Sequence, residues 1–159
     1  MRRTILVLLF MVISSPAMAL DVMTSFGGGA VIQDGAQPAL TFNAGFKIPV
    51  YTKNESGLQV FTEGAILWSD RSVNGLAEFQ GLSETIYVKK SIYKTVYVGT
   101  GTGLLQIVNS DGSDEECHTY GIITGLTAIG LDISLGCDIF KLTGPDAYYP
   151  YARVKILGL

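Results

Sequence analysis

Charged side chains are scarce in this 159-residue chain, because lysine, arginine, aspartate and glutamate together make up only 16% of it. Typical soluble domains have about 25%. The 14 acidic residues outnumber the 11 basic ones, and no basic stripe runs along any segment. A nucleic-acid-binding surface needs such a stripe to neutralise phosphates, so the composition argues against nucleic acid as a partner.

A long hydrophobic run occurs only once, at the N-terminus. Arg2 and Arg3 precede the apolar stretch 4–13, and Ala17-Met18-Ala19 has the small-x-small pattern of a signal cleavage site. The run is shorter than the roughly 20 apolar residues of a membrane-spanning helix. We therefore expect a cleavable secretory signal over residues 1–19 and a single mature domain over 20–159. Without Arg2 and Arg3, nine basic and 14 acidic residues remain, a net charge of −5.

Helix-type periodicity, low-complexity tracts and domain linkers are absent from the rest of the sequence. Turn-forming residues such as Asp34-Gly35, Asp111-Gly112 and Gly144-Pro145 instead separate short segments. Each segment is about ten residues long, the length that a tilted strand needs to cross a bilayer. The sequence predicts eight strands, at 22–32, 39–50, 58–68, 82–92, 95–108, 117–128, 131–142 and 149–159.

Alternation is clearest in the second, seventh and eighth of these segments. Successive side chains of a strand point to opposite faces, and here one face is aliphatic and the other polar. In the third segment Phe61 and Leu67 fall on the polar face, and the first, fourth and fifth segments alternate less clearly. The aliphatic faces are Leu40, Phe42, Ala44, Phe46 and Ile48; Leu131, Ile133, Leu135, Cys137 and Ile139; and Ala152, Val154 and Ile156.

A tight turn at Ile129-Gly130 would bring the aliphatic faces of two neighbouring strands to one side. It would place Ala128 opposite Leu131 and Ile122 opposite Cys137, and a slip of one residue would scatter the faces. Extending the seventh strand across the loop at Pro145 predicts that Asp138 lies opposite Arg153, with Lys155 one step away.

The same alternation fits two all-β folds of opposite polarity. In a soluble exported barrel or sandwich the aliphatic face is the core, whereas in a membrane barrel it meets lipid and the polar face lines the lumen. Two features of the polar faces favour the membrane barrel: many small residues, which suit a narrow eight-stranded interior, and charges of both signs, which can neutralise one another. The predicted lumen charge network comprises Lys47, Glu63, Asp132, Asp138, Arg153 and Lys155.

Aromatic residues near the predicted strand ends favour the membrane barrel as well. Amphipathic rings at both rims form the girdles of proteins that cross a lipid–water interface. The predicted girdle comprises Tyr51, Tyr93 and Tyr97 at the periplasmic end, and Trp68, Tyr120, Tyr148 and Tyr149 at the outer end. The fold expected is thus an eight-stranded antiparallel up-and-down transmembrane β-barrel.

In its plan the mature chain resembles small eight-stranded bacterial outer-membrane proteins of the OmpX and OmpA transmembrane-domain type. The shared features are the signal peptide, strand count, alternation, girdles and a C-terminal strand. The resemblance implies a bacterial outer-membrane location, a monomer surrounded by lipid, and a structural, envelope-maintenance or surface-interaction role toward an unidentified ligand or envelope protein. Such families usually end in an aromatic residue, whereas this chain ends in Leu159.

Few residues could perform catalysis. The only histidine, His118, lies two residues before Tyr120. Some outer-membrane lipid A deacylases are similar barrels with a His-x-Ser pair, but here a tyrosine stands where the nucleophilic serine is needed. A lone histidine at the rim is the simpler interpretation, so we expect no enzymatic activity. An outer-membrane lipid-modifying hydrolase and a soluble exported domain that binds an apolar ligand are the alternatives.

Other motifs do not indicate a cofactor or a metal. The acidic run Asp111, Asp114, Glu115 and Glu116 lacks the spacing of an EF-hand loop. The stretch 99–103, Gly-Thr-Gly-Thr-Gly, lacks the Gly-Lys-Ser/Thr ending of a phosphate-binding loop. An exported protein can form disulfides, but the expected hairpin register separates Cys117 from Cys137 by more than a disulfide can span.

Overall fold

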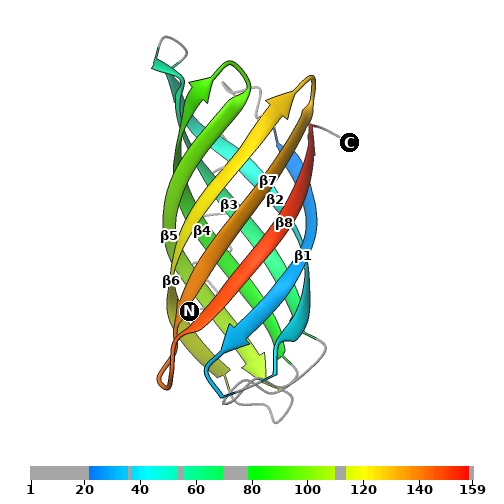
Figure 1. The fold of residues 1–159 in the computed structure, drawn as a ribbon, viewed down its shortest axis with the longest axis vertical. Coiled ribbons are helices and arrows are strands. Elements are labelled where there is room, and N and C mark those ends of the chain that lie inside the picture. The colour runs from blue at the N-terminus through cyan, green and yellow to red at the C-terminus, as the bar shows by residue number, and fades with distance from the viewer. Residues whose placement is uncertain (1–21, 36, 54–55, 70–78, 110–113, 158–159) are drawn as a thin grey trace, which may run out of the picture.

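The computed structural model describes residues 22–35, 37–53, 56–69, 79–109 and 114–157. They form a closed antiparallel barrel in which each strand pairs with the next and the first pairs with the last (Figure 1). No helix in these residues is long and apolar enough to cross a membrane. The strands are β1 (Met23–Gln33), β2 (Ala39–Lys53), β3 (Leu58–Ser69), β4 (Phe79–Tyr93), β5 (Val96–Asn109), β6 (Asp114–Ala128), β7 (Leu131–Lys141) and β8 (Ala147–Leu157).

The predicted strand count and the all-β barrel are confirmed, and each predicted strand overlaps an observed one. The main differences are at the ends, where β4 begins at Phe79 and β6 at Asp114, three residues earlier than expected. Backbone ladder pairs continue there into polar sequence, for example Val108 with Asp114. The predicted signal, residues 1–19, lies outside the described residues.

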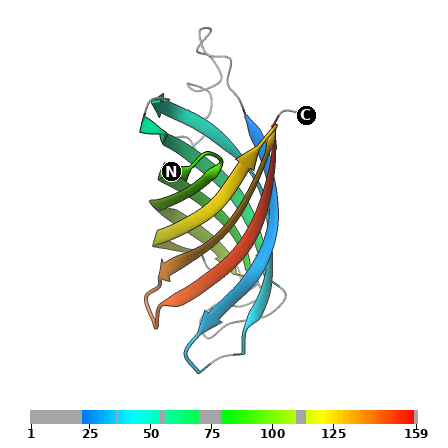
Figure 2. The ribbon, with the colours of Figure 1, turned by 45° about the horizontal axis from the view of Figure 1, so that its top comes forward.

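The two ends of the barrel differ in their connections. β1 begins and β8 finishes at one end, here called the terminus end, which is uppermost in Figure 1. This end also holds the short connections β2–β3, β4–β5 and β6–β7. The opposite end, here called the loop end, holds the connections β1–β2, β3–β4, β5–β6 and β7–β8. Figure 2 shows the tilted strands of the wall from a view turned toward the terminus end.

The β6–β7 hairpin has the register that the sequence predicts. Ala128 pairs with Leu131, and Ile122 with Cys137. The turn residues Ile129 and Gly130 have φ angles of 33° and 76°, and positive values at both positions are the signature of the two-residue type I′ turn, whose twist matches that of the strands. This tight turn fixes the register, and with it the face on which every side chain of the hairpin lies.

The register predicted for β7 and β8 is wrong. Asp138 pairs with Tyr149, not with Arg153, and Arg153 pairs with Ser134. The ladder continues to Phe140 and Ala147, so the connection between the two strands is shorter than the sequence suggested. The register shift is an even number of residues along each strand, so Asp138 and Arg153 still face the same side of the sheet.

Polarity across the wall decides between the two all-β folds. The exposed side of the barrel is aliphatic and aromatic, with Phe42, Leu135 and Ile122 exposed by 64%, 59% and 66%. The enclosed side includes seven ionisable side chains that are at most 9% exposed. A soluble barrel would have the opposite polarity, whereas an apolar exterior around a polar interior is the organisation of a transmembrane barrel.

Candidate functional site

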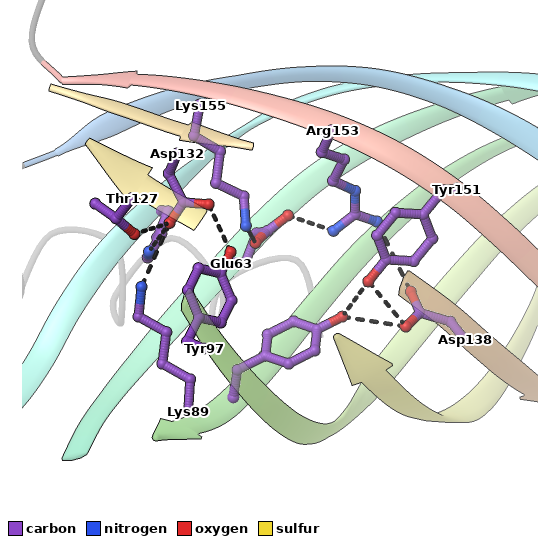
Figure 3. Close-up of polar contacts among 11 residues, drawn as sticks. Glu63, Lys89, Tyr97, Thr127, Asp132, Asp138, Tyr151, Arg153 and Lys155 are labelled. Carbon is purple, nitrogen blue, oxygen red and sulfur yellow. Dashed lines mark hydrogen bonds and ion pairs between the residues drawn. The ribbon is translucent and has the colours of Figure 1, made fainter. Parts of the chain in front are cut away.

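Ionisable residues on five strands meet inside the barrel, mainly in its middle and toward the terminus end (Figure 3). All six residues of the predicted network are buried there, and the sequence analysis missed a seventh, Lys89 on β4. We call this set the lumen charge cluster. Its members are Lys47, Glu63, Lys89, Asp132, Asp138, Arg153 and Lys155.

Asp132 is the acceptor of the first group in the cluster. Lys47 Nζ donates to its Oδ2 at 3.0 Å, and Lys89 Nζ reaches the same oxygen at 3.4 Å. Tyr97 Oη donates to Oδ1 at 2.6 Å, and Thr127 Oγ1 lies 3.4 Å from Oδ2. The Asp132 carboxylate is fully buried, and these donors from four other strands replace the water that it would otherwise bind.

Glu63 is the acceptor of the second group. Arg153 Nη1 donates to its Oε1, and Lys155 Nζ lies 2.9 Å from its Oε2. All three side chains are at most 4% exposed. One carboxylate on β3 therefore pairs with two cations on β8, which lies across the lumen rather than beside it in the sheet.

Asp138 extends the cluster toward the loop end. It accepts hydrogen bonds from Tyr87 Oη at 3.1 Å and from Tyr151 Oη at 3.3 Å. Arg153 Nη2 lies 3.7 Å from its Oδ2. The predicted pairing of Asp138 with Arg153 thus exists as a contact through the lumen, although the two residues are not register partners.

Aromatic rings help to balance the cluster, which has four cations and only three carboxylates. Lys89 Nζ lies 4.0 Å from the centroid of the Tyr97 ring, and Lys47 Nζ lies 4.3 Å from that of Phe61. The Arg153 guanidinium lies 3.8 Å from the centroid of Tyr151. Such faces attract cations more strongly where water is excluded, which explains why a phenylalanine occupies the polar face of β3.

Glycines of β5, β6 and β7 make room for the lumen tyrosines. A Cβ on Gly101 would lie 2.4 Å from Tyr87 Cδ1, and one on Gly125 would lie 2.7 Å from Tyr97 Oη. A Cβ on Gly136 would meet the Tyr151 ring. The small residues that the sequence analysis assigned to a narrow interior are therefore matched to particular large neighbours.

Toward the loop end the lumen contains a cluster of packed apolar side chains. The residues that pack there are all at most 3% exposed. They are Val31, Ala39, Leu67, Leu105, Ile107, Cys117, Phe140 and Ala147. Their packing excludes water from the space that they fill, and Gln33, Thr41 and Thr119 are buried polar residues at the same end.

The predicted girdle divides into two sets. Tyr51, Trp68, Tyr93, Tyr120 and Tyr148 are exposed on the outer wall, at the ends where the sequence placed them. Tyr97 and Tyr149 instead lie inside the barrel, and this part of the prediction is wrong. Their alternation places them on the lumen face, where Tyr97 bonds Asp132 and Tyr149 Oη accepts from Asn43 Nδ2 at 2.7 Å.

The remaining candidate residues do not assemble into a site. His118 is exposed on the outer wall, with Leu104 and Lys141 as its register partners. Both cysteines are free: Cys117 is buried in the lumen, while Cys137 follows the lipid-facing alternation of β7. Among the described residues no group of three or more histidine, cysteine, aspartate or glutamate side chains could hold a metal ion.

The structure also shows where the stretch 99–103 and most of the acidic run lie. Residues 99–103 lie in the middle of β5, so they cannot form a phosphate-binding loop. In the acidic run, Glu115 accepts hydrogen bonds from the Thr143 backbone N–H at 3.1 Å and from its hydroxyl at 2.5 Å. Glu115 thereby links β6 to the β7–β8 connection; Asp111 lies outside the described residues.

Solved structures with the same fold are small outer-membrane barrels. The outer membrane enzyme PagL superimposes with a TM-score of 0.69 at 14% identity, over 86% of this chain and 99% of that one. Neisserial surface protein A gives 0.56, and Ail, the attachment invasion locus protein of Yersinia pestis, gives 0.50. Each of the two is 14% identical over 86% of this chain and 96% of its own. No protein-family model and no curated protein sequence matches.

These similarities confirm the predicted resemblance in fold to small eight-stranded outer-membrane barrels. Together with the apolar exterior, they support the outer-membrane location that the sequence predicts. The named proteins include an enzyme, a surface protein and an attachment invasion locus protein, so the fold alone is compatible with more than one kind of function.

Proposed function

We propose that this protein is a non-enzymatic barrel of the bacterial outer membrane with a structural, envelope-maintenance or surface-interaction role. The lumen is the observation on which this proposal chiefly depends. Its charged residues are paired with one another, and packed aliphatic side chains follow them toward the loop end. The interior of an eight-stranded barrel is just wide enough for such side chains. The lumen is therefore filled, and the barrel does not act as a pore.

The exposed residues of the outer wall indicate that the partner of the barrel is lipid. Its apolar residues are spread over all eight strands and include Phe26, Leu40, Ile66, Ile86, Val98, Ile122, Leu135 and Val154. A surface of this extent on a water-soluble monomer would aggregate. Outer-membrane lipid is therefore the proposed surrounding, with the protein as a monomer within it.

A lipid-modifying hydrolase is the second candidate, because PagL is named as an enzyme and has the same fold. His118 is on the outer wall, where it could meet lipid. The residues around it favour the non-enzymatic proposal: Tyr120 replaces the serine nucleophile that the sequence pattern requires, and the register partner of His118 on β7 is the cation Lys141. A catalytic histidine needs a nucleophile and a group that orients it.

The test combines two assays on the protein refolded into lipid bilayers. We expect no steady single-channel conductance in planar bilayers, because the lumen is filled. We also expect mass spectra of lipopolysaccharide and phospholipid that stay unchanged after incubation with the protein. The His118→Ala variant serves as the matched control. Products formed by the natural sequence and lost in this variant would establish the hydrolase instead, and a defined open-channel conductance would contradict the closed lumen.

A further inference from the structure

Apart from Glu84 near the middle of β4, the exposed charges of the described residues lie toward the two ends of the barrel and differ in sign between them. At the loop end one exposed lysine, Lys141, stands among acidic side chains and forms an ion pair with one of them. At the terminus end the exposed charged residues are all lysines: Lys53, Lys90 and Lys94. The loop-end acids are Asp34, Asp114, Glu115, Glu116 and Asp146.

The three lysines lie on two adjoining hairpins at the terminus end. β2 and β4 have 15 residues each, against 11 in β1, β7 and β8. Lys53 pairs with Leu58, which pairs with Lys90, so the first two lysines lie in one row across β2, β3 and β4. The Ser91 backbone N–H donates to Gly57 O at 3.0 Å and connects the two hairpins. We call Lys53, Lys90 and Lys94, with the adjoining described ends of β2 and β4, the basic ledge.

Exposed apolar and aromatic side chains accompany the lysines on the basic ledge. Tyr93 and Ile92 are 66% and 64% exposed, and Lys94 Nζ lies 5.4 Å from the centroid of the Tyr93 ring. Val50 and Tyr51 are exposed on the neighbouring hairpin. Tyrosine rings of this kind sit at the level of lipid headgroups, and lysine side chains extend from the apolar wall to the same level.

The three ammonium groups are not neutralised within the described chain. None of the three lysines takes part in an ion pair between described residues. The β2–β3 connection contains one acidic residue in the sequence, Glu55, and Asp21 precedes β1; both lie outside the described residues. Lys90 shares its face of β4 with Ile86 and Val88, so the ledge continues the lipid-facing wall.

We propose that the basic ledge binds the phosphate groups of anionic phospholipids in the leaflet that surrounds the terminus end. This inference rests on the proposed function, and with Tyr51 and Tyr93 at the periplasmic end, as the sequence predicts, that leaflet is the inner leaflet of the outer membrane. Lysines beside a membrane surface attract anionic headgroups, and the adjacent aromatic and aliphatic side chains hold the acyl region of the same lipids. The loop end also has exposed aromatic side chains, but acidic residues predominate there and its Lys141 is paired with Asp146, so it should show no such preference.

Electron paramagnetic resonance of spin-labelled lipids tests this inference. The protein is reconstituted in phosphatidylcholine vesicles with a trace of labelled phosphatidylglycerol or labelled phosphatidylcholine, and the motionally restricted fraction is measured. We expect phosphatidylglycerol to associate roughly threefold or more strongly than phosphatidylcholine at low salt, and less selectively at high salt, because exposed charges are screened. The variant Lys53→Gln/Lys90→Gln/Lys94→Gln should lose the selectivity, and Lys141→Gln at the loop end should retain it.

The outcomes separate this inference from the proposed function. A selectivity that persists in the triple variant, or that is absent from the natural sequence, would overturn the basic ledge as a phospholipid site while the barrel remains in the bilayer. If the natural sequence shows no selectivity, the basic ledge would instead be a candidate binding site for an acidic protein or polymer. If neither labelled lipid shows a restricted fraction, the protein is not embedded, and the proposed function and the inference are both overturned.

Discussion

Glu63→Gln is expected to lower the free energy of unfolding in detergent micelles by about 3–5 kcal/mol, the usual cost of removing one partner of a buried ion pair. Glu63 is 2% exposed and accepts from Arg153 and Lys155. After the substitution, the nearest carboxylate to Arg153 is that of Asp138, at 3.7 Å. Two buried cations would then share a neutral amide, and neither can reach water without opening the barrel.

Glu84→Gln is the matched control for this experiment. Glu84 is adjacent in sequence to Thr85, the register partner of Glu63, but its side chain is exposed on the outer wall. The same chemical change there should leave stability unchanged or raise it slightly, because no described cation pairs with Glu84. Urea titrations followed by tryptophan fluorescence of Trp68 give both values. Adding Lys155→Met to Glu63→Gln should recover part of the loss, because fewer cations remain unpaired.

Equal effects of Glu63→Gln and Glu84→Gln would contradict the assignment of the lumen charge cluster. Strict additivity of Glu63→Gln and Lys155→Met would mean that the two side chains do not interact in the membrane-mimetic environment.

Leu135→Arg should destabilise the barrel in a lipid bilayer by about 2–4 kcal/mol, the measured range for arginine at the bilayer midplane of an outer-membrane barrel. Leu135 lies near the middle of β7 and is directed outward. Its replacement places a guanidinium in hydrocarbon, where no lumen carboxylate can reach it. Ile129→Arg in the turn of the same hairpin is the control, since Ile129 is fully exposed at the terminus end, and an arginine there remains in water.

Equilibrium unfolding in phospholipid vesicles measures the stability of both variants. A large loss of stability is expected for Leu135→Arg and little change for Ile129→Arg. A negligible effect of Leu135→Arg would show that residue 135 does not face lipid.

Much of the fold could be predicted because alternation and turn chemistry are local properties. β7 has an aliphatic residue at nearly every second position, and Gly130 provides the left-handed conformation that a two-residue hairpin needs. Together they determine which face of β6 and β7 is outward, and the structure reproduces the predicted pairs. The same parity rule placed Asp138 and Arg153 in the lumen even though their register was wrong.

Other features depend on distant residues and could not be predicted. The length of the β7–β8 connection decides which residues are opposite each other, and Pro145 alone does not reveal it. Lys89 was missed because β4 also has Glu84 on its outer face, which blurs the alternation. The adjacent residues Lys89 and Lys90 could have predicted it. Neighbouring residues of a strand face opposite sides, so one of these two lysines must face the lumen.

The lumen tyrosines show a further limit of sequence patterns. A tyrosine near a strand end suits either a lipid interface or a polar interior, because its ring is apolar and its hydroxyl is polar. Position along the strand alone predicts that Tyr97 and Tyr149 belong to the girdle. Only the closed barrel shows that Tyr97 on β5 reaches Asp132 on β7 inside the lumen, and that Gly125 leaves space for the Tyr97 ring.

A nitroxide scan along β7, one label per variant from residue 131 to 139, tests most directly whether this chain is a barrel with lipid outside and its charges inside. With the protein in phospholipid vesicles, collision rates with oxygen and with a water-soluble nickel reagent are measured at each site. Labels at 133, 135 and 137 should be accessible to oxygen and protected from nickel, whereas labels at 132, 134 and 138 should be immobile and shielded from both. The opposite alternation, or nickel access along the whole strand, would contradict the account.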